Sequence, residues 1–325
     1  MLKNTTIFTI SILASAIALS ACQPKQTEPK QDQTAASEAV QAEVLKLAGD
    51  SEKLTLDLPE CDGNSCPEIS IERLSSNQAF IDEFIDQQIL KQLDHILDIS
   101  PKLAKENQQA TTAENPKASK AQDQAAEQAA SVAIETPKQK LEQQVAPYLV
   151  NFLSLDKELK ALSANHQISL MIKPKILNAD VPLATVVLNS SSYLGGAHGS
   201  SSQRYYNFDL EKKKQVELND ILVPNQKAAL EKKAHEVFKT WVIESKLANS
   251  VEEYEQAWKF TLSDNFYLSS QGLILQYGEY EIGPYVVGLP RLTIPYDQLQ
   301  TVLKKQYLPQ VEAPASTPAA NKAKP

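Results

Sequence analysis

The first group in this chain with evident chemistry is the thiol of Cys22. It follows Leu19-Ser20-Ala21 and an apolar run of 13 residues that starts at Ile7. A helix of that length spans roughly 20 Å, which is short of the ~30 Å hydrocarbon core of a bilayer. With Lys3 in front, residues 1–21 are typical of a lipoprotein signal peptide, and we expect Cys22 to be acylated. Ordinary secretion with an incidental cysteine is the alternative.

Acylation would hold the protein to a membrane, because each buried methylene contributes about 0.8 kcal/mol and two or more chains anchor stably. In lipoprotein sorting in two-membrane bacteria, Asp after the cysteine favours the inner membrane. Gln23 stands there instead. We therefore expect the outer membrane, with the protein facing the periplasm.

Cys61 and Cys66 are the other two cysteines, and Asp62-Gly63-Asn64-Ser65 between them is turn chemistry. In an oxidising envelope compartment this spacing favours a disulfide. A metal site is the weaker alternative, because no second pair of Cys or His lies nearby. We expect no bound metal and no cofactor.

A glycine-rich segment presents the most conspicuous histidine. Gly195, Gly196 and Gly199 flank His198 and permit a sharp turn. His198, Tyr193 and Tyr206 together are candidate ligand-binding residues. The alternative is a histidine whose hydrogen bonds only hold the loop in shape.

A second candidate patch is formed by Tyr280, Glu281 and Tyr285, with Pro284 stiffening the turn. A tyrosine can bury its ring while its hydroxyl stays in water, which suits a binding surface. A loop that closes the end of a sheet is an equally good interpretation. Trp241 and Trp258 are expected to be core anchors.

No catalytic residue is predicted, since the chain lacks Gly-x-Ser-x-Gly, His-Glu-x-x-His and P-loop patterns. The rival hypothesis is an enzyme of cell-wall sugars that uses His198 with a nearby carboxylate such as Glu281 or Asp209. The formal charge is −8 and scattered. This argues against a nucleic-acid partner and leaves a cationic protein partner open.

Strands and helices alternate without a regular βαβ order, so the chain is expected to be α+β, with antiparallel sheets packed on helices. Strands are expected at 53–58, 67–73, 168–172, 181–189, 205–210, 215–218 and 292–294, and two more within 265–280 on either side of a turn at Ser270-Gln271-Gly272. Helices are expected at 77–97, at 141–162 with an interruption at Pro147, from Asn225 and Ser250, and at 298–305.

Composition suggests two small domains between flexible ends. The expected segments are a signal peptide at 1–21, a tether at 22–50, an N-terminal domain at 51–180, a C-terminal domain at 181–308 and a tail at 309–325. A low-complexity insert at about 105–138 interrupts the first domain.

Two segments carry a family resemblance. They are Ser192-Tyr193-Leu194-Gly195-Gly196-Ala197-His198-Gly199 with Tyr206-Asn207-Phe208-Asp209-Leu210, and Phe266 to Tyr296 with its Tyr280-Glu281-Ile282-Gly283-Pro284-Tyr285 core. In this order they resemble the RsiV-like domain family, named from an anti-sigma factor whose extracytoplasmic part binds lysozyme. The same domain accompanies polysaccharide deacetylases, and a weaker resemblance of 53–178 is to its usual companion domain.

The resemblance implies a non-enzymatic binding lipoprotein whose ligand is a lysozyme-like protein or a peptidoglycan glycan. Anti-sigma activity is not implied, because residues 1–21 are expected to be a signal peptide rather than a sigma-binding segment. An envelope scaffold protein is a further alternative.

Overall fold

A computed structural model describes residues 45–61, 65–97, 135–162 and 167–309. The predicted signal peptide, Cys22, nearly all of the tether, almost the whole insert and all but the first residue of the tail lie outside these ranges, so the predictions about them stay predictions. No helix in the described ranges is long and apolar enough to cross a membrane. The predicted α+β class is confirmed, since helices combine with two sheets whose strands pair mainly antiparallel.

The larger sheet has the order β1-β2-β3-β4-β5-β6. Its strands are β1 (Gly49–Lys53), β2 (Glu68–Ser76), β3 (Ser169–Asn178), β4 (Ala184–Tyr193), β5 (Ser200–Asp209) and β6 (Lys214–Val216). Only β2 and β3 are parallel within it. Parallel neighbours need a long crossover, which α2 (Ala79–Ile96) and α4 (Pro137–Ala161) supply.

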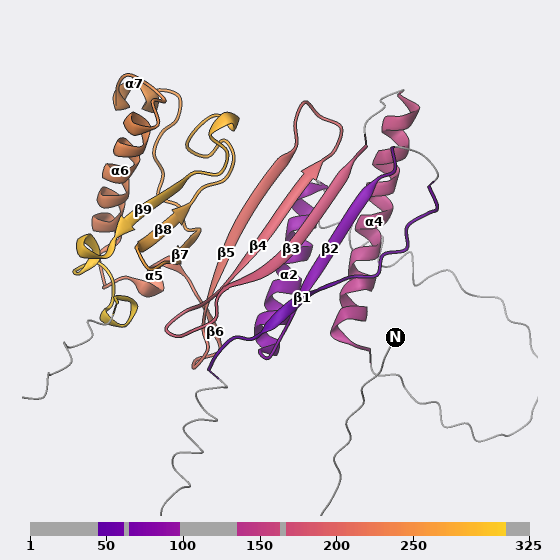
Figure 1. Ribbon diagram of the computed structural model, residues 1–325, viewed down its shortest axis with the longest axis horizontal. Helices are drawn as coiled ribbons and strands as arrows, with labels where there is room; N and C mark the ends of the chain where they lie inside the picture. The colour runs from indigo at the N-terminus through magenta and orange to yellow at the C-terminus, as the bar shows by residue number, and fades with distance from the viewer. Residues whose placement is uncertain (1–44, 62–64, 98–134, 163–166, 310–325) are drawn as a thin grey trace, which may run out of the picture. The chain divides into compact units, whose positions relative to one another are not determined.

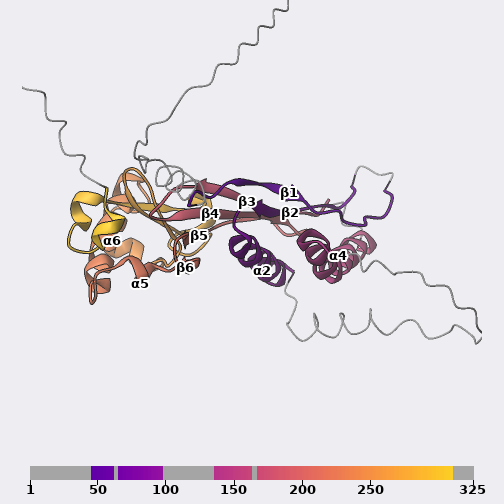
Figure 2. The same cartoon turned by 90° about the horizontal axis from the view of Figure 1, so that it is seen from below.

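Both crossover helices cover the same face of this sheet (Figures 1 and 2). Ile81, Ile85, Ile89 and Leu93 recur every four residues along α2 and are fully buried. Each such side chain contributes about 1.5–3 kcal/mol when it leaves water. The helical spacing predicted for this segment is therefore confirmed as a core face.

The smaller sheet has the order β7-β8-β9 and is antiparallel throughout. Its strands are β7 (Phe266–Leu268), β8 (Gly272–Gln276) and β9 (Arg291–Pro295). The helices around it are α5 (Leu218–Ile221), α6 (Lys227–Glu244) and α7 (Val251–Glu255), with 3-10 turns η1 (Tyr285–Val287), η2 (Tyr296–Leu299) and η3 (Lys305–Tyr307). The α6 helix packs against β9.

Three expected elements differ from those observed. The strand expected at 53–58 lies earlier, as β1. The α4 helix continues through Pro147, because Leu141, Val145 and Phe152 on either side of the proline are buried in the core. No continuous α-helix forms over 298–305, where only the ends of η2 and η3 are helical, because the backbone at Val302 and Lys304 pairs with Val223 and Ile221.

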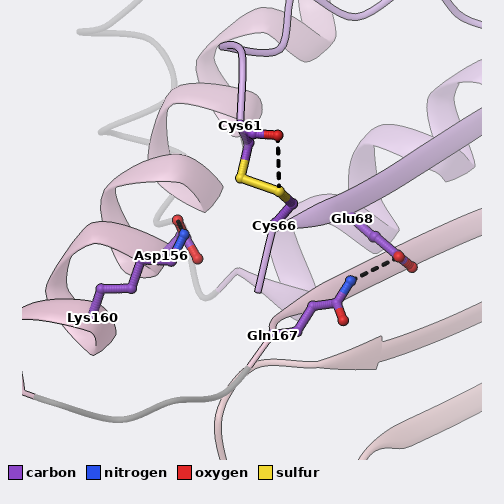
Figure 3. Close-up of a disulfide and its surroundings, with 6 residues drawn as sticks. All are labelled: Cys61, Cys66, Glu68, Asp156, Lys160 and Gln167. Atoms are coloured by element: carbon purple, nitrogen blue, oxygen red, sulfur yellow. Dashed lines mark hydrogen bonds and ion pairs between the residues drawn. A yellow bond between two sulfur atoms is a disulfide. The ribbon is translucent and has the colours of Figure 1, made fainter. Parts of the chain in front are cut away.

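A disulfide joins Cys61 and Cys66, as predicted, with an S–S distance of 2.09 Å (Figure 3). It lies in the connection between β1 and β2. Figure 3 also shows the Asp156–Lys160 ion pair of α4 and the hydrogen bond that Gln167 donates to Glu68. The crosslink closes a short surface loop and leaves the packed interior to the hydrophobic residues.

Two hydrophobic cores accompany the two sheets. Val186 and Leu188 of β4 and Phe208 of β5 belong to the first core, and Leu183 and Val216 belong to the second. The domain boundary predicted at residue 181 thus falls between β3 and β4, which are neighbours in one sheet. That division stays a prediction.

Side-chain amides connect the two sheets. Asn265, just before β7, accepts a hydrogen bond from the backbone N–H of Tyr205 and donates one to the carbonyl of Gln203, both at 2.8 Å. Asn207 in turn donates to the carbonyl of Phe266 at 2.8 Å. These bonds satisfy backbone groups of β5 beyond its pairing with β6, and one backbone carbonyl of β7. They also bring the loops of the smaller sheet next to the β4–β5 turn.

Candidate functional site

The two predicted patches form one site in the structure. The β4–β5 turn, residues 194–199, meets the segment 278–288 between β8 and β9. The hydroxyl of Tyr285 donates to the carbonyl of Gly199 at 3.0 Å, and Glu279 accepts from the Ser201 N–H at 2.8 Å and the Ser200 hydroxyl at 2.9 Å. Residues far apart in the sequence therefore share one surface.

His198 has both ring nitrogens engaged. Its Nδ1 lies 2.9 Å from the carbonyl of Gly199, and a carbonyl only accepts, so Nδ1 carries the hydrogen. In the neutral ring, Nε2 then accepts from the Tyr280 hydroxyl at 3.0 Å. The imidazole also stacks on the Tyr285 ring with centroids 3.9 Å apart. Because the lone pair of Nε2 already accepts this hydrogen bond, the geometry suits an imidazole ring that serves as a contact surface.

Tyr280 adopts an uncommon backbone conformation, with φ of +62°. A left-handed conformation costs a residue with a side chain roughly 1–2 kcal/mol, and for a bulky side chain it is an outlier. The turn is held by Glu281, whose carboxylate accepts from the Gly278 N–H at 2.7 Å. The Tyr280 side chain is 49 % exposed, so core packing does not account for the strained backbone conformation. Strain of this kind concentrates at functional sites.

The α7 helix supports the segment from behind. Ser250 caps α7 by accepting from the Glu253 N–H, and the Tyr254 hydroxyl donates to the carbonyl of Ile282 at 3.0 Å. A side chain at Gly283 would come within 2.6 Å of that hydroxyl, which explains the glycine. The backbone of the segment is thus fixed by α7 and by the buried Ile282, while Tyr280, Tyr285 and Val286 are exposed.

We call Trp258, Tyr280, His198, Tyr285 and Val286 the aromatic patch. Trp258 is half-buried and stacks toward Tyr280 with ring centroids 6.4 Å apart. Tyr285 is 37 % exposed and Val286 is 87 % exposed. An almost fully exposed valine next to two exposed tyrosines is unusual on a surface that contacts only water. The arrangement can bury apolar area while the hydroxyls and the imidazole supply polar contacts.

Carboxylates are frequent in the two chain segments that carry most of the aromatic patch. Glu252, Glu253 and Glu281 are exposed and Glu279 is half-exposed. Lys259 is the only Lys or Arg within 252–259 and 278–288. These two segments therefore carry a negative net charge.

The remaining predicted site residues lie elsewhere or play supporting parts. Gly195 has φ of +86°, and a Cβ there would lie 2.8 Å from Leu159 of α4. Gly196 is open, and Tyr193 is half-exposed at the end of β4. Tyr206 is not brought to the patch. Its ring packs edge-on against Phe84 of α2, and burial raises the pKa of its hydroxyl to about 12.

Sequence reasoning missed several members of the site. Trp258 was expected to be a core anchor, and its ring does pack against the second core, but it also reaches the patch. Val286 and Glu279 adjoin the predicted Tyr285 and Tyr280, and that adjacency in an irregular segment was the available signal.

The carboxylates named in the rival hypothesis have other partners. Glu281 holds Gly278, and Asp209 accepts from Lys212. Among the residues that the structure covers, no hydrogen bond joins His198 to a carboxylate. Over the same ranges, no group of three or more His, Cys, Asp or Glu side chains is arranged to hold a metal ion.

Fold and site together define an α+β protein in which an exposed aromatic patch spans the turn of one sheet and a loop of another. Residues 219–297 match a family described as "Protein of unknown function (DUF3298)", so the chain carries a DUF3298 domain in its C-terminal part. This match contains Trp258, Tyr280 and Tyr285, whereas His198 precedes it.

Two solved structures described as DUF3298 family proteins share the fold. A DUF3298 family protein from Pseudomonas aeruginosa PAO1 is 22% identical, with a TM-score of 0.54 over 82% of this chain and 97% of that one. A DUF3298 family member from Bacteroides fragilis NCTC 9343 is 17% identical, with a TM-score of 0.50 over 81% of this chain and 94% of that one. Comparison with curated proteins gives no match.

Proposed function

We propose that this chain is a lipid-anchored, non-enzymatic binding protein of the bacterial envelope, and that the aromatic patch captures a cationic, lysozyme-like protein. The observation that carries the proposal is Tyr280, an exposed aromatic residue kept in a strained conformation and bonded to His198. Conformational strain without a packing benefit suits a side chain kept for a partner.

The ligand class follows from the patch and its surroundings. Large aromatic residues at the centre of an interface contribute much of the binding free energy. Surrounding charges steer association and select partners. The acidic residues around the patch, Glu252, Glu253, Glu279 and Glu281, favour a basic partner. The RsiV-like resemblance of the same segments supports a lysozyme-like protein as that partner.

The anchor part of the proposal rests on Cys22 and the apolar run before it. Acyl chains at Cys22 would place the domains on a membrane, with a tether of roughly 30 residues giving them reach. Labelling with a radioactive or alkyne fatty acid in cells tests this. We expect label on the wild type and none on Cys22→Ala.

Binding is tested with the full-length chain in detergent micelles and a basic lysozyme, by calorimetry. We expect saturable binding that weakens at higher salt, because charge contributes to association. Val286→Ser should weaken binding about tenfold, since burying a valine contributes about 1.5–3 kcal/mol. Val150→Ser is the matched control, because Val150 on α4 is 64 % exposed and lies outside the patch.

No detectable binding at micromolar lysozyme would refute the ligand class. Equal weakening by the two valine substitutions would refute the aromatic patch as the binding surface. Hydrolysis of a cell-wall glycan by the purified chain, lost in His198→Ala, would instead favour the enzyme hypothesis.

A further inference from the structure

A cleft also adjoins His198. It has a volume of about 410 Å³ and lies between the C-terminal end of α2 and the β4–β5 hairpin. Gln92 and His95 line it from the helix, Ser190 and Ser202 from the strands, and His198 from the turn. Its volume is within the range of about 300–1,000 Å³ that is typical of small-molecule sites.

The lining of this cleft combines polar side chains with the apolar Ile96 and Leu194. No Asp, Glu, Lys or Arg belongs to the part of the lining that the structure describes. Hydroxyl groups from both strands, an amide and two imidazoles face a common space. Such a surface offers hydrogen bonds in many directions and no counter-charge, so it suits a neutral, polyhydroxylated ligand better than an ion.

The hydroxyl groups are held in place before any ligand arrives. Ser190 is only 6 % exposed, and its hydroxyl lies 2.7 Å from that of Ser202. The Gln92 amide donates to the Ser190 hydroxyl at 3.1 Å. The carbonyl oxygen of Gln92 has no hydrogen bond from another side chain in the described part of the chain and can receive an N–H of a ligand. Preorganised polar groups lower the entropic cost of binding.

An aromatic surface adjoins the cleft. The His198 ring lines the cleft and stacks on Tyr285 at 3.9 Å. Sugar rings present apolar C–H faces beside their hydroxyl groups, and such faces pack on aromatic rings. The hydroxyl and amide groups of the cleft can bond to the hydroxyl groups of a saccharide, and the adjoining stacked rings can pack against its C–H face.

We infer that this cleft is a saccharide-binding site that takes an uncharged N-acetylated amino sugar of a glycan chain, with Ser190 and Gln92 as its polar contacts. The inference goes beyond the proposed capture of a protein by adding a second ligand, and it shares only His198 with the aromatic patch.

The test is calorimetric titration of the full-length chain, without lysozyme, with tetra-N-acetylchitotetraose. We expect saturable binding with a dissociation constant of about 1 mM or tighter. The double variant Ser190→Ala with Gln92→Leu should weaken binding at least about tenfold, because hydrogen bonds to the sugar are lost.

Thr185→Val is the matched control for folding. Thr185 lies on β4 like Ser190, and its buried hydroxyl also bonds to a side chain, that of Asn207, but it is not part of the cleft. The Thr185→Val variant should lose stability and keep its sugar affinity. Thermal melting of each variant separates a loss of stability from a loss of affinity. Absence of saturable binding, or equal affinity in the cleft variant, would overturn the inference.

The outcome is separable from that of the protein-capture proposal. Val286→Ser should weaken lysozyme binding and leave sugar affinity unchanged, since Val286 does not line the cleft. Sugar binding without lysozyme binding would support the cleft and remove the protein ligand. Lysozyme binding without sugar binding would do the reverse.

Discussion

The Tyr280 hydroxyl donates to Nε2 of His198 at 3.0 Å across a sequence separation of 82 residues. This bond ties the loop of the smaller sheet to the turn of the larger one. It groups the imidazole with two tyrosine rings on the surface, each ring centroid lying within 6.2 Å of the other two. We expect that mutations of these residues can change ligand affinity and the free energy of unfolding to different extents.

Tyr280→Gly should leave the free energy of unfolding within about 1 kcal/mol of wild type. Glycine relieves the left-handed strain of roughly 1–2 kcal/mol, and this offsets the loss of one exposed hydrogen bond worth about 0.5–1.5 kcal/mol. Lysozyme affinity should nevertheless fall at least about tenfold, because the central ring is gone. Urea unfolding and calorimetry measure the two quantities. A large loss of stability would show that Tyr280 serves the fold instead.

Asn265→Ala should destabilise the protein by about 2–4 kcal/mol. The substitution leaves the Tyr205 N–H and the Gln203 carbonyl without their partner, and each buried unsatisfied group costs about 1–3 kcal/mol. Urea unfolding measures the change. Asn219→Ala, at an exposed position on α5, should stay within about 0.5 kcal/mol. Similar values for the two variants would mean that the amide connection is unimportant.

Arg73→Met should cost about 3–5 kcal/mol. The Arg73 side chain is 5 % exposed and forms ion pairs with Asp86 at 2.9 Å and with Glu52 at 2.8 Å. Burial raises the pKa of Asp86 even with the Arg73 guanidinium beside it. Removing the guanidinium therefore leaves the buried Asp86 carboxylate without a counter-charge. Lys239→Met removes the cation of an exposed pair with Glu236 and should change stability by less than about 1 kcal/mol. Thermal unfolding of both variants at neutral pH compares them.

Asp209→Asn should reduce the loss of stability in acid. Burial by itself raises the pKa of Asp209, but hydrogen bonds from the side chain and backbone of Lys212 outweigh it and hold this pKa below its ordinary value of 3.8. The carboxylate therefore contributes stability above about pH 4, which is lost as the pH falls through its folded-state pKa.

The measurement is urea unfolding of both proteins between neutral pH and about pH 2. The wild type should lose more stability than Asp209→Asn below about pH 4, since asparagine does not titrate. Parallel curves would show that the Lys212 contacts do not lower the pKa of this carboxyl.

The local sequence pattern was sufficient to predict the elements that depend only on neighbouring residues. The recurrence of Ile81, Ile85, Ile89 and Leu93 predicted α2 and its buried face, because a helix places every fourth residue on one side. The spacing of Cys61 and Cys66 predicted their disulfide. The segments around His198 and Tyr285 were both identified, since glycine and proline mark loops whatever surrounds them.

Local pattern failed where distant backbone decided the outcome. Residues 298–305 have helical spacing, yet the backbone of Val302 and Lys304 pairs with the chain at α5. Strand alternation places Tyr205 and Tyr206 on opposite faces, but only the packing of α2 decides that Tyr206 is the one beneath a helix. For that reason Tyr206 was grouped with His198 from the sequence and lies apart from it in the structure.

The sequence by itself determined the helices and strands with strong periodicity, the disulfide, and the two loop segments that carry the site. The tertiary structure alone decided that these loops meet, because Asn265 bonds the β5 backbone at Gln203 and Tyr205, beyond the residues that pair with β6. It also decided the strained backbone of Tyr280, which depends on bonds to Gly278 and His198 formed only in the folded chain. Periodicity records local geometry, whereas contacts across 82 residues depend on how the sheets are assembled.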